Sequence, residues 1–223
     1  MKKCRTTKLF WDKYLYKFVL SNSVGSIFRS KNLSYARKVL DNLQSQYESG
    51  DQLKIERFRR YDIIKESHFL DARKLYKFLS KYNDYTLRIE RSVTSIYSNN
   101  REWLHTVKSA LHKENLLEFW EPNIEDIKTL AQNIIIVENN NGYEYKVTLG
   151  SGTAPTSGFS NFAKTNPNLI RVGPVLMEEL EHNGYVNNMY FYARDDRTLQ
   201  LCNLMLDNIR RVDKLVTKPN LDK

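Results

Sequence analysis

Short stretches in which apolar and polar residues alternate are separated by longer stretches with helical spacing, and this pattern occurs twice along the chain. Residues 8–20 alternate and end in Tyr16–Leu20, which predicts the second arm of a hairpin. Residues 134–149 alternate in the same way around an Asn-Gly step, which is typical of a tight hairpin turn. The strands predicted at Tyr16–Leu20 and Tyr145–Leu149 share the pattern Tyr-Lys-apolar-x-Leu.

The segments that follow these strands also correspond. A helix is predicted from Asp71 to Tyr82 in the first half, and a shorter one around Phe159 and Ala163 in the second. Each half then continues with two short strands, a capped amphipathic helix and a closing strand. These are the strands at 86–89 and 169–172, the strands at 95–97 and 190–192, the helices after Asn99-Asn100 and Asp195-Asp196, and the closing strands at 116–120 and 209–216.

Each half therefore has the element order β-α-β-β-α-β. This order resembles the ferredoxin-like, or RRM-like, sandwich, in which an antiparallel sheet carries two helices on one face. The sequence thus predicts an α+β protein made by tandem duplication of this unit. The predicted parts are residues 1–121 with a helical insert at about 21–70, a connector helix at 122–133 beginning at Asn123, and residues 134–223.

The positive charge of the chain is concentrated in the first half. The whole chain carries 35 Lys+Arg and 26 Asp+Glu, a formal net charge of +9. Residues 1–121 hold 24 basic and 14 acidic residues, whereas residues 122–223 hold 11 and 12. A dense basic cluster lies at Lys54, Arg57, Arg59 and Arg60. Such a surface is the usual electrostatic footprint of a nucleic-acid-binding protein, although a solvated basic face is the alternative interpretation.

Strand alternation places a similar set of side chains on the open face of each predicted sheet. If the apolar residues face the helices, the side chains on the other face are Lys17, Arg88 and Tyr97 in the first half, and Lys146, Arg171, Tyr190 and Tyr192 in the second. Aromatic rings flanked by cations can stack bases and contact phosphates, which favours single-stranded nucleic acid as a partner. Alternatively, the tyrosines are buried, either because the two sheets pack face to face or because the 21–70 insert covers them.

Recognisable catalytic or metal-binding motifs are absent from the sequence. None of the four histidines occurs in a zinc or nuclease motif, and the two cysteines, Cys4 and Cys202, lie far apart. The Gly-rich stretch 150–158 lacks the ending of a phosphate-binding loop. We therefore predict no cofactor, no metal and no catalytic residue. Without a long apolar stretch or a signal peptide, we expect an intracellular, cytoplasmic protein with no membrane partner.

These observations lead to a hypothesis of a non-enzymatic nucleic-acid-binding protein that acts mainly through its basic half, with RNA and DNA left open. The second unit would serve as a scaffold, for docking a protein partner or for self-association. The main alternative is a structural or assembly protein, possibly of a virus or phage, whose basic half faces nucleic acid or an acidic partner.

A third hypothesis comes from the predicted domain pair. Two ferredoxin-like domains in a basic chain of this size also resemble the CRISPR repeat-processing endoribonucleases. That resemblance implies metal-independent RNA cleavage with a histidine, such as His68 or His105, as the base. The chain carries Arg210–Lys214 where that family has a glycine-rich loop.

Overall fold

The computed structural model describes residues 1–30, 33–57, 60–153 and 157–218. The chain divides into two compact units, Met1–Ile127 (unit 1) and Lys128–Lys223 (unit 2). Each unit contains a five-stranded sheet and three α-helices within the described ranges, so the predicted α+β class and the two-fold repetition are confirmed. In those same ranges no helix is both long enough and apolar enough to span a membrane.

Unit 1 contains one mixed sheet, one separate hairpin and three α-helices. The sheet has the strand order β1-β7-β2-β6-β5, in which only the β1–β7 pair is parallel. The elements are β1 (Lys2–Thr6), β2 (Tyr16–Ser21), η1 (Gly25–Phe28), α1 (Ser34–Glu48), β3 (Lys54–Arg57), β4 (Arg60–Ile63), α2 (Glu66–Leu79), β5 (Tyr85–Glu90), β6 (Val93–Ser98), α3 (Arg101–Ala110), η2 (Lys113–Asn115) and β7 (Leu116–Pro122).

Unit 2 is built in the same way. Its sheet has the order β11-β13-β9-β14-β8, and only the β14–β8 pair is parallel. The elements are β8 (Ile134–Val137), β9 (Tyr145–Leu149), β10 (Gly152–Thr153), α4 (Ser157–Thr165), β11 (Ile170–Val172), α5 (Pro174–Glu181), β12 (Tyr185–Val186), β13 (Tyr190–Ala193), α6 (Asp196–Met205) and β14 (Ile209–Thr217).

The two sheets have equivalent topologies. Strands β2, β5, β6 and β7 occupy the same relative places in unit 1 as β9, β11, β13 and β14 occupy in unit 2. In both sheets a further strand, β1 or β8, pairs in parallel with the last strand of its own unit. The repeat detected in the sequence therefore extends to strand order and direction, and to one strand that the repeated pattern did not include.

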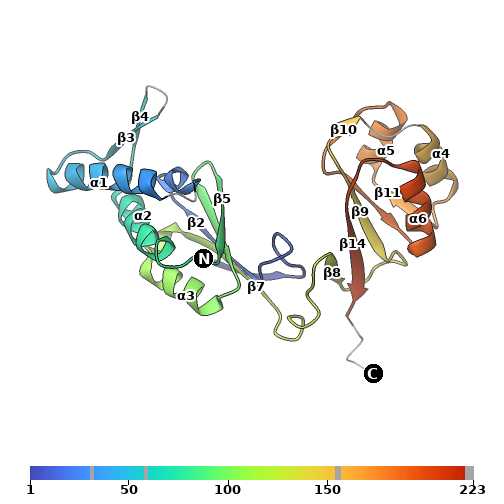
Figure 1. Ribbon diagram of the computed structural model, residues 1–223, viewed down its shortest axis with the longest axis horizontal. Helices are drawn as coiled ribbons and strands as arrows, with labels where there is room; N and C mark the ends of the chain where they lie inside the picture. Colours follow the sequence, from blue (N-terminus) through green and yellow to red (C-terminus); the bar gives the residue numbers. More distant parts are fainter. Residues whose placement is uncertain (31–32, 58–59, 154–156, 219–223) are drawn as a thin grey trace. The chain divides into compact units, whose positions relative to one another are not determined.

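The helices of each unit lie together on one face of its sheet (Figure 1). In unit 1, Phe18 and Ile96 on the sheet are fully buried with Leu75 of α2 and Leu104 of α3. In unit 2 the corresponding core joins Val147, Leu149 and Phe191 to the helix residues Phe159 and Cys202. Burying each large apolar side chain contributes about 1.5–3 kcal/mol, so the side chains that face the helices fix the orientation of every strand.

Two helices begin at the capping residues that the sequence indicates. Asn100 Oδ1 accepts a hydrogen bond from the Trp103 backbone N–H of α3 at 2.9 Å. Asp195 Oδ1 accepts from both the backbone N–H and the hydroxyl of Thr198 in α6, at 2.8 and 2.7 Å. Each cap satisfies a backbone donor that has no partner inside its helix.

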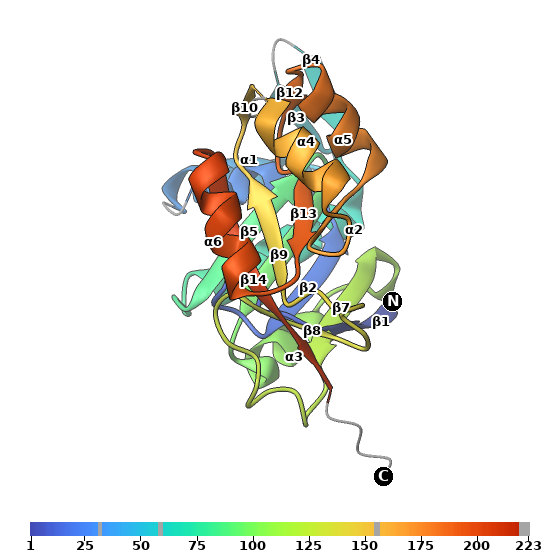
Figure 2. The ribbon, with the colours of Figure 1, turned by 90° about the vertical axis from the view of Figure 1, so that its right-hand side faces the viewer.

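The two predicted N-terminal hairpins are wrong. Strand β8 does not pair with β9, because β14 lies between them in the sheet (Figure 2). In unit 1 the segment before β2 forms only a tight turn with a bridge from Phe10 to Tyr14, while the preceding strand is β1. Turn residues do occur at 139–142, but the apolar run Ile134–Val137 finds its partner about 80 residues away. A local turn signal does not determine such a parallel pairing.

The predicted connector helix at 122–133 is also wrong. Residues 124–129 form consecutive turns, and Asn123 donates a side-chain hydrogen bond to Asp126 Oδ2 at 3.2 Å. Ile124 is 86% exposed whereas Leu130 is buried, so the apolar residues that suggested a helix do not form one buried stripe. The insert at 21–70 contains the predicted helix as α1, together with the β3–β4 hairpin, which the basic stretch forms.

Candidate nucleic-acid interface

The face of the unit 2 sheet that points away from the helices carries a row of polar and aromatic side chains. Across four neighbouring strands, Arg171 pairs with Tyr192, Tyr192 with Lys146, and Lys146 with Asp213. Tyr190 lies two residues from Tyr192 on the same strand, so both rings project from the same face. We call Lys146, Arg171, Tyr190 and Tyr192 the tyrosine face.

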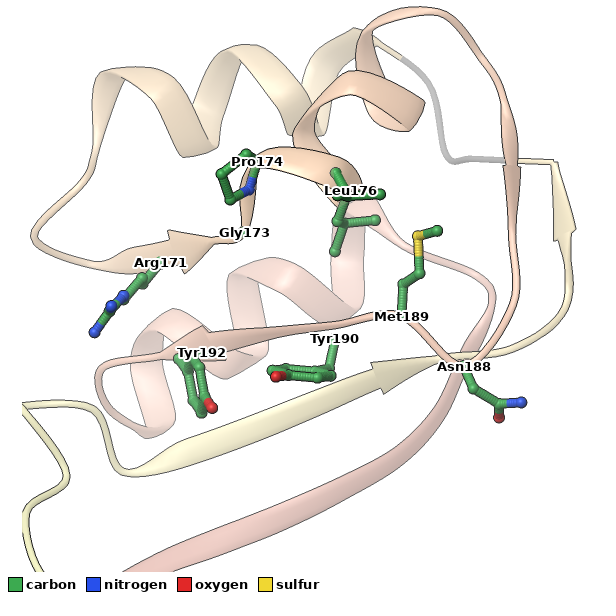
Figure 3. A pocket seen from close by; sticks show the side chains of 9 residues that line it. Arg171, Gly173, Pro174, Leu176, Asn188, Met189, Tyr190 and Tyr192 are labelled. Atoms are coloured by element: carbon green, nitrogen blue, oxygen red, sulfur yellow. The ribbon is translucent and has the colours of Figure 1, made fainter.

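The two tyrosine rings contact each other and a cation. Their centroids lie 5.6 Å apart with an interplanar angle of 77°, an edge-to-face arrangement. The Lys146 ammonium lies 3.8 Å from the centre of the Tyr190 ring. Tyr190 is 44% exposed, and Figure 3 shows it beside Tyr192, with Arg171 projecting from the neighbouring strand. An accessible ring and two cations are thus held within one small area.

A hollow of about 500 Å³ opens beside these rings. It is bounded by Tyr190, Tyr192 and Arg171, and by apolar side chains at the start of α5 that include Pro174 and Leu176 (Figure 3). A volume of this size is typical of a small-molecule site and accommodates a planar ring against the tyrosines. The tyrosine face therefore combines positive charge with a hollow that can hold a planar ring.

An ion pair between Arg211 and Asp213 lies beside the two cations of the tyrosine face. Asp213 is 3% exposed and accepts a hydrogen bond from Arg211 Nε at 2.6 Å. The three cations Lys146, Arg171 and Arg211 outnumber the carboxylate of Asp213, so these four side chains together carry a net positive charge. Burial raises the pKa of Tyr192, with the nearby Tyr190 adding to the effect, so its hydroxyl remains protonated near neutral pH.

The loop between β8 and β9 borders the tyrosine face. Tyr143 in this loop lies 6.3 Å from the Tyr192 ring, and its hydroxyl donates to the Pro167 carbonyl at 2.9 Å. A second hollow, of about 230 Å³, lies between this loop, Lys146 and Tyr192. Tyr192 thus separates two hollows on one surface.

The corresponding face of unit 1 is covered, so Tyr97 is not exposed as predicted. Lys17 pairs with Tyr97 across β2 and β6, as Lys146 pairs with Tyr192 across β9 and β13. Tyr97 is nevertheless only 4% exposed, because Phe10 and Trp11 pack on it with centroid distances of 5.6 and 6.0 Å. Within unit 1 the covering segment is the loop before β2, rather than the 21–70 insert. Burial raises the pKa of Tyr97.

At this place in unit 1 the exposed aromatic side chain is not that of Tyr97 but that of Trp11. Its side chain is 56% exposed, and both Trp11 and Asp12 have a φ of 54°. A left-handed backbone is unfavourable for a bulky residue, so the tight turn holds this ring outward against a local energetic cost. On the neighbouring strands β2 and β7, the Lys17 ammonium lies 5.4 Å from the Trp120 ring. Sequence reasoning missed Trp11, although the run of large apolar residues before the turn was visible.

Arg88 does not occupy the position equivalent to Arg171. It pairs with Ser95, whereas Thr86 is the residue that faces Tyr97. Its guanidinium forms an exposed ion pair with Glu90 at 2.6 Å, and this ion pair partly satisfies its charge. The predicted equivalence of the two units thus holds for the Lys–Tyr pair but not for the arginine.

The basic cluster forms part of a separate two-stranded hairpin. Strands β3 and β4 extend beyond α1 (Figure 1), with Lys54 and Arg60 exposed on them. Arg57 belongs to β3, but its side chain and the whole of Arg59 lie outside the described residues. Counted by structural unit, Met1–Ile127 carries 24 basic and 16 acidic residues, and unit 2 carries 11 and 10. The positive excess therefore remains in unit 1.

Neither a metal site nor a relative identifies the function. Within the described ranges, no group of three or more His, Cys, Asp or Glu side chains could hold a metal ion. Comparison with protein families, with curated proteins and with solved structures finds no match to this chain. The function is therefore inferred from the side chains described above.

Proposed function

We propose that this protein binds single-stranded nucleic acid on the tyrosine face of unit 2, while the basic unit 1 contacts further phosphates. The observation that carries the proposal is the Tyr190–Tyr192 pair beside Lys146 and Arg171 at a 500 Å³ hollow. A base stacked on an aromatic ring contributes roughly 1–3 kcal/mol, and the two cations would meet the flanking phosphates.

The Lys146 ammonium changes its contact when a base binds. In the free protein it lies over the Tyr190 ring, where a cation–π contact contributes about 0.5–1 kcal/mol at an exposed site. A base that stacks on the same ring face displaces the ammonium toward the adjacent phosphate. Binding then replaces the contact between ammonium and ring by a contact between base and ring and a contact between ammonium and phosphate.

We also propose that each unit is a ferredoxin-like domain with one added strand. The supporting feature is the order of the four repeated strands, fourth-first-third-second, in both sheets. In this fold the face opposite the helices is the open one, which is where the tyrosine face lies. The fold proposal and the binding proposal thus concern the same surface.

Titration of the full chain with labelled single-stranded RNA and DNA oligonucleotides tests the binding proposal. We expect binding at low salt that weakens steeply as salt increases, with a logarithmic slope of about −0.7 for each neutralised phosphate. Duplex DNA should compete poorly, because stacked bases cannot reach the rings. Absence of binding to both single strands at low salt would overturn the proposal.

Self-association is a second candidate, supported by a different observation. Leu204, Leu201 and Met205 on α6 are 84%, 38% and 41% exposed, and their spacing places them on one side of that helix. Exposed apolar patches of this kind favour contact with another protein surface. An assembly protein would show a concentration-dependent mass in solution that a Leu204→Glu variant abolishes, whereas a monomer at all concentrations would exclude it.

A further inference from the structure

Ser23 and His68 of unit 1 are hydrogen-bonded although they are 45 residues apart in the chain. The Ser23 hydroxyl lies 2.9 Å from His68 Nδ1, and the Ser23 backbone N–H donates to the same nitrogen at 3.2 Å. Ser23 is in the loop after β2, and His68 is in the first turn of α2. Because a backbone N–H can only donate, Nδ1 is the acceptor nitrogen of this imidazole.

A buried polar chain fixes the other side of the His68 ring. His68 forms a side-chain hydrogen bond with Asn115. The Asn115 amide donates to Asp71 Oδ2 at 2.7 Å, and fully buried Asp71 also accepts from His112 Nδ1 at 2.7 Å. With its NH₂ group directed to Asp71, Asn115 offers its oxygen to His68. The imidazole therefore carries its proton on Nε2 and presents the Nδ1 lone pair to Ser23.

Ser23 also lines a hollow of about 600 Å³ that contains two arginines, Arg29 and Arg91, and one acidic residue, Glu56. Both arginines are exposed, and neither has an ion-pair partner among the residues that the structure describes. Arg91 has a φ of 52° in the tight turn between β5 and β6, a conformation that costs about 1–2 kcal/mol for a residue with a side chain. An arginine at a position that suits glycine or asparagine points to a role for its guanidinium.

We propose that this hollow is a phosphate-ester site, in which Ser23 is the nucleophile, His68 the general base, and Arg29 and Arg91 the groups that hold the phosphate oxygens. The arrangement follows the general pattern of an activated serine, in which a base contacts the nucleophile and a third group orients the base. Paired guanidinium groups are suited to phosphate because each can donate two parallel hydrogen bonds.

The reaction balances with water as the co-reactant. The Ser23 Oγ–P bond forms as the P–O bond to the leaving group breaks, and the hydroxyl proton passes to His68 Nδ1. That proton then passes to the leaving oxygen, which departs as an alcohol. Water next attacks phosphorus and gives a proton to His68 Nδ1. The P–Oγ bond to Ser23 then breaks, and His68 returns that proton to Ser23 Oγ, which restores the hydroxyl. Burial lowers the pKa of His68, which keeps the base neutral at physiological pH.

The experiment uses the full chain and bis(4-nitrophenyl) phosphate. We expect a burst of 4-nitrophenol that does not exceed the amount of protein, together with a nitrophenylphosphoryl adduct that peptide mapping places on Ser23. Ser23→Ala should abolish both, and His68→Gln should slow the burst by about 10²–10⁴-fold. Ser45→Ala is the matched control, because Ser45 is an exposed serine of α1 outside the hollow and should leave the burst unchanged.

Arg91→Gly separates loss of chemistry from loss of folding. Glycine removes the guanidinium and relieves the left-handed backbone, so the variant should fold at least as well while its burst slows at least tenfold. Arg37→Gln, on the exposed side of α1, removes the same charge outside the hollow and should have no effect. A folded wild-type chain without an adduct, or an adduct that persists in Ser23→Ala, would overturn the proposal. Neither result depends on whether the tyrosine face binds nucleic acid.

Discussion

Replacing Tyr190 by alanine should weaken nucleic-acid binding while leaving the fold intact. Tyr190 is 44% exposed, and its inward-facing neighbour Phe191, which packs on Phe159 at 5.0 Å, is not altered. The truncation opens no cavity in the core, so the free energy of unfolding should change by less than about 1 kcal/mol. The variant loses the stacking contribution of roughly 1–3 kcal/mol per base. The dissociation constant should therefore rise by about 5- to 150-fold.

Fluorescence anisotropy with a labelled single-stranded oligonucleotide measures this change directly. Tyr190→Phe should retain most of the affinity, because it keeps the ring and removes only the hydroxyl. Tyr185→Ala is the matched control: Tyr185 is 64% exposed in the same unit but belongs to the small β10–β12 sheet. Lys146→Met should lower the salt slope by about 0.7, the share of one phosphate contact.

Two results would contradict this prediction: Tyr190→Ala binds as tightly as the wild type, or Tyr185→Ala weakens binding by the same factor. In the first case the ring is not part of the contact surface. In the second the effect is general to exposed tyrosines and does not identify the tyrosine face. A melting temperature unchanged in both variants excludes misfolding as the cause of either result.

Three further predictions concern the fold. Asp195→Ala removes the cap of α6 and should cost about 1 kcal/mol in chemical denaturation, whereas Asp195→Asn should retain most of it. Burial raises the pKa of the Cys202 thiol to about 12, so an aromatic disulfide reagent should react with Cys4 and reach Cys202 only in denaturant. Burial lowers the pKa of His68 and His105 below 6.5, so the unfolded chain binds these protons more tightly. The melting temperature should then fall as the pH decreases through 6.5, and less steeply in His105→Phe.

Local sequence patterns were sufficient for most helices and strands but not for all strand partners. The strand Tyr145–Leu149 has the predicted bounds, because its apolar alternation and flanking polar residues are local signals. Strand β1 was missed because Lys2–Thr6 is a polar edge strand without a buried alternating face. The partner of β8 was wrong because it depends on β14, at the other end of the unit.

The candidate sites were predictable to different degrees. Alternation correctly placed Lys146, Tyr190 and Tyr192 on one face, since side-chain period is a property of the strand itself. The exposure of Tyr97 was not predictable, because it depends on how the loop carrying Trp11 folds back. The contact between Ser23 and His68 has no sequence signature at all, because the topology of unit 1 brings the two residues together.

The parallel edge strands have a consequence for how the chain can be divided. Each unit starts with the strand that pairs with its own last strand, so neither five-stranded sheet takes a strand from the other half of the chain. A cut between Ile127 and Lys128 would leave every one of these ladders intact. Each unit is therefore self-contained in its strand pairing, and the excess positive charge and the serine–histidine pair lie in one unit while the accessible aromatic surface lies in the other.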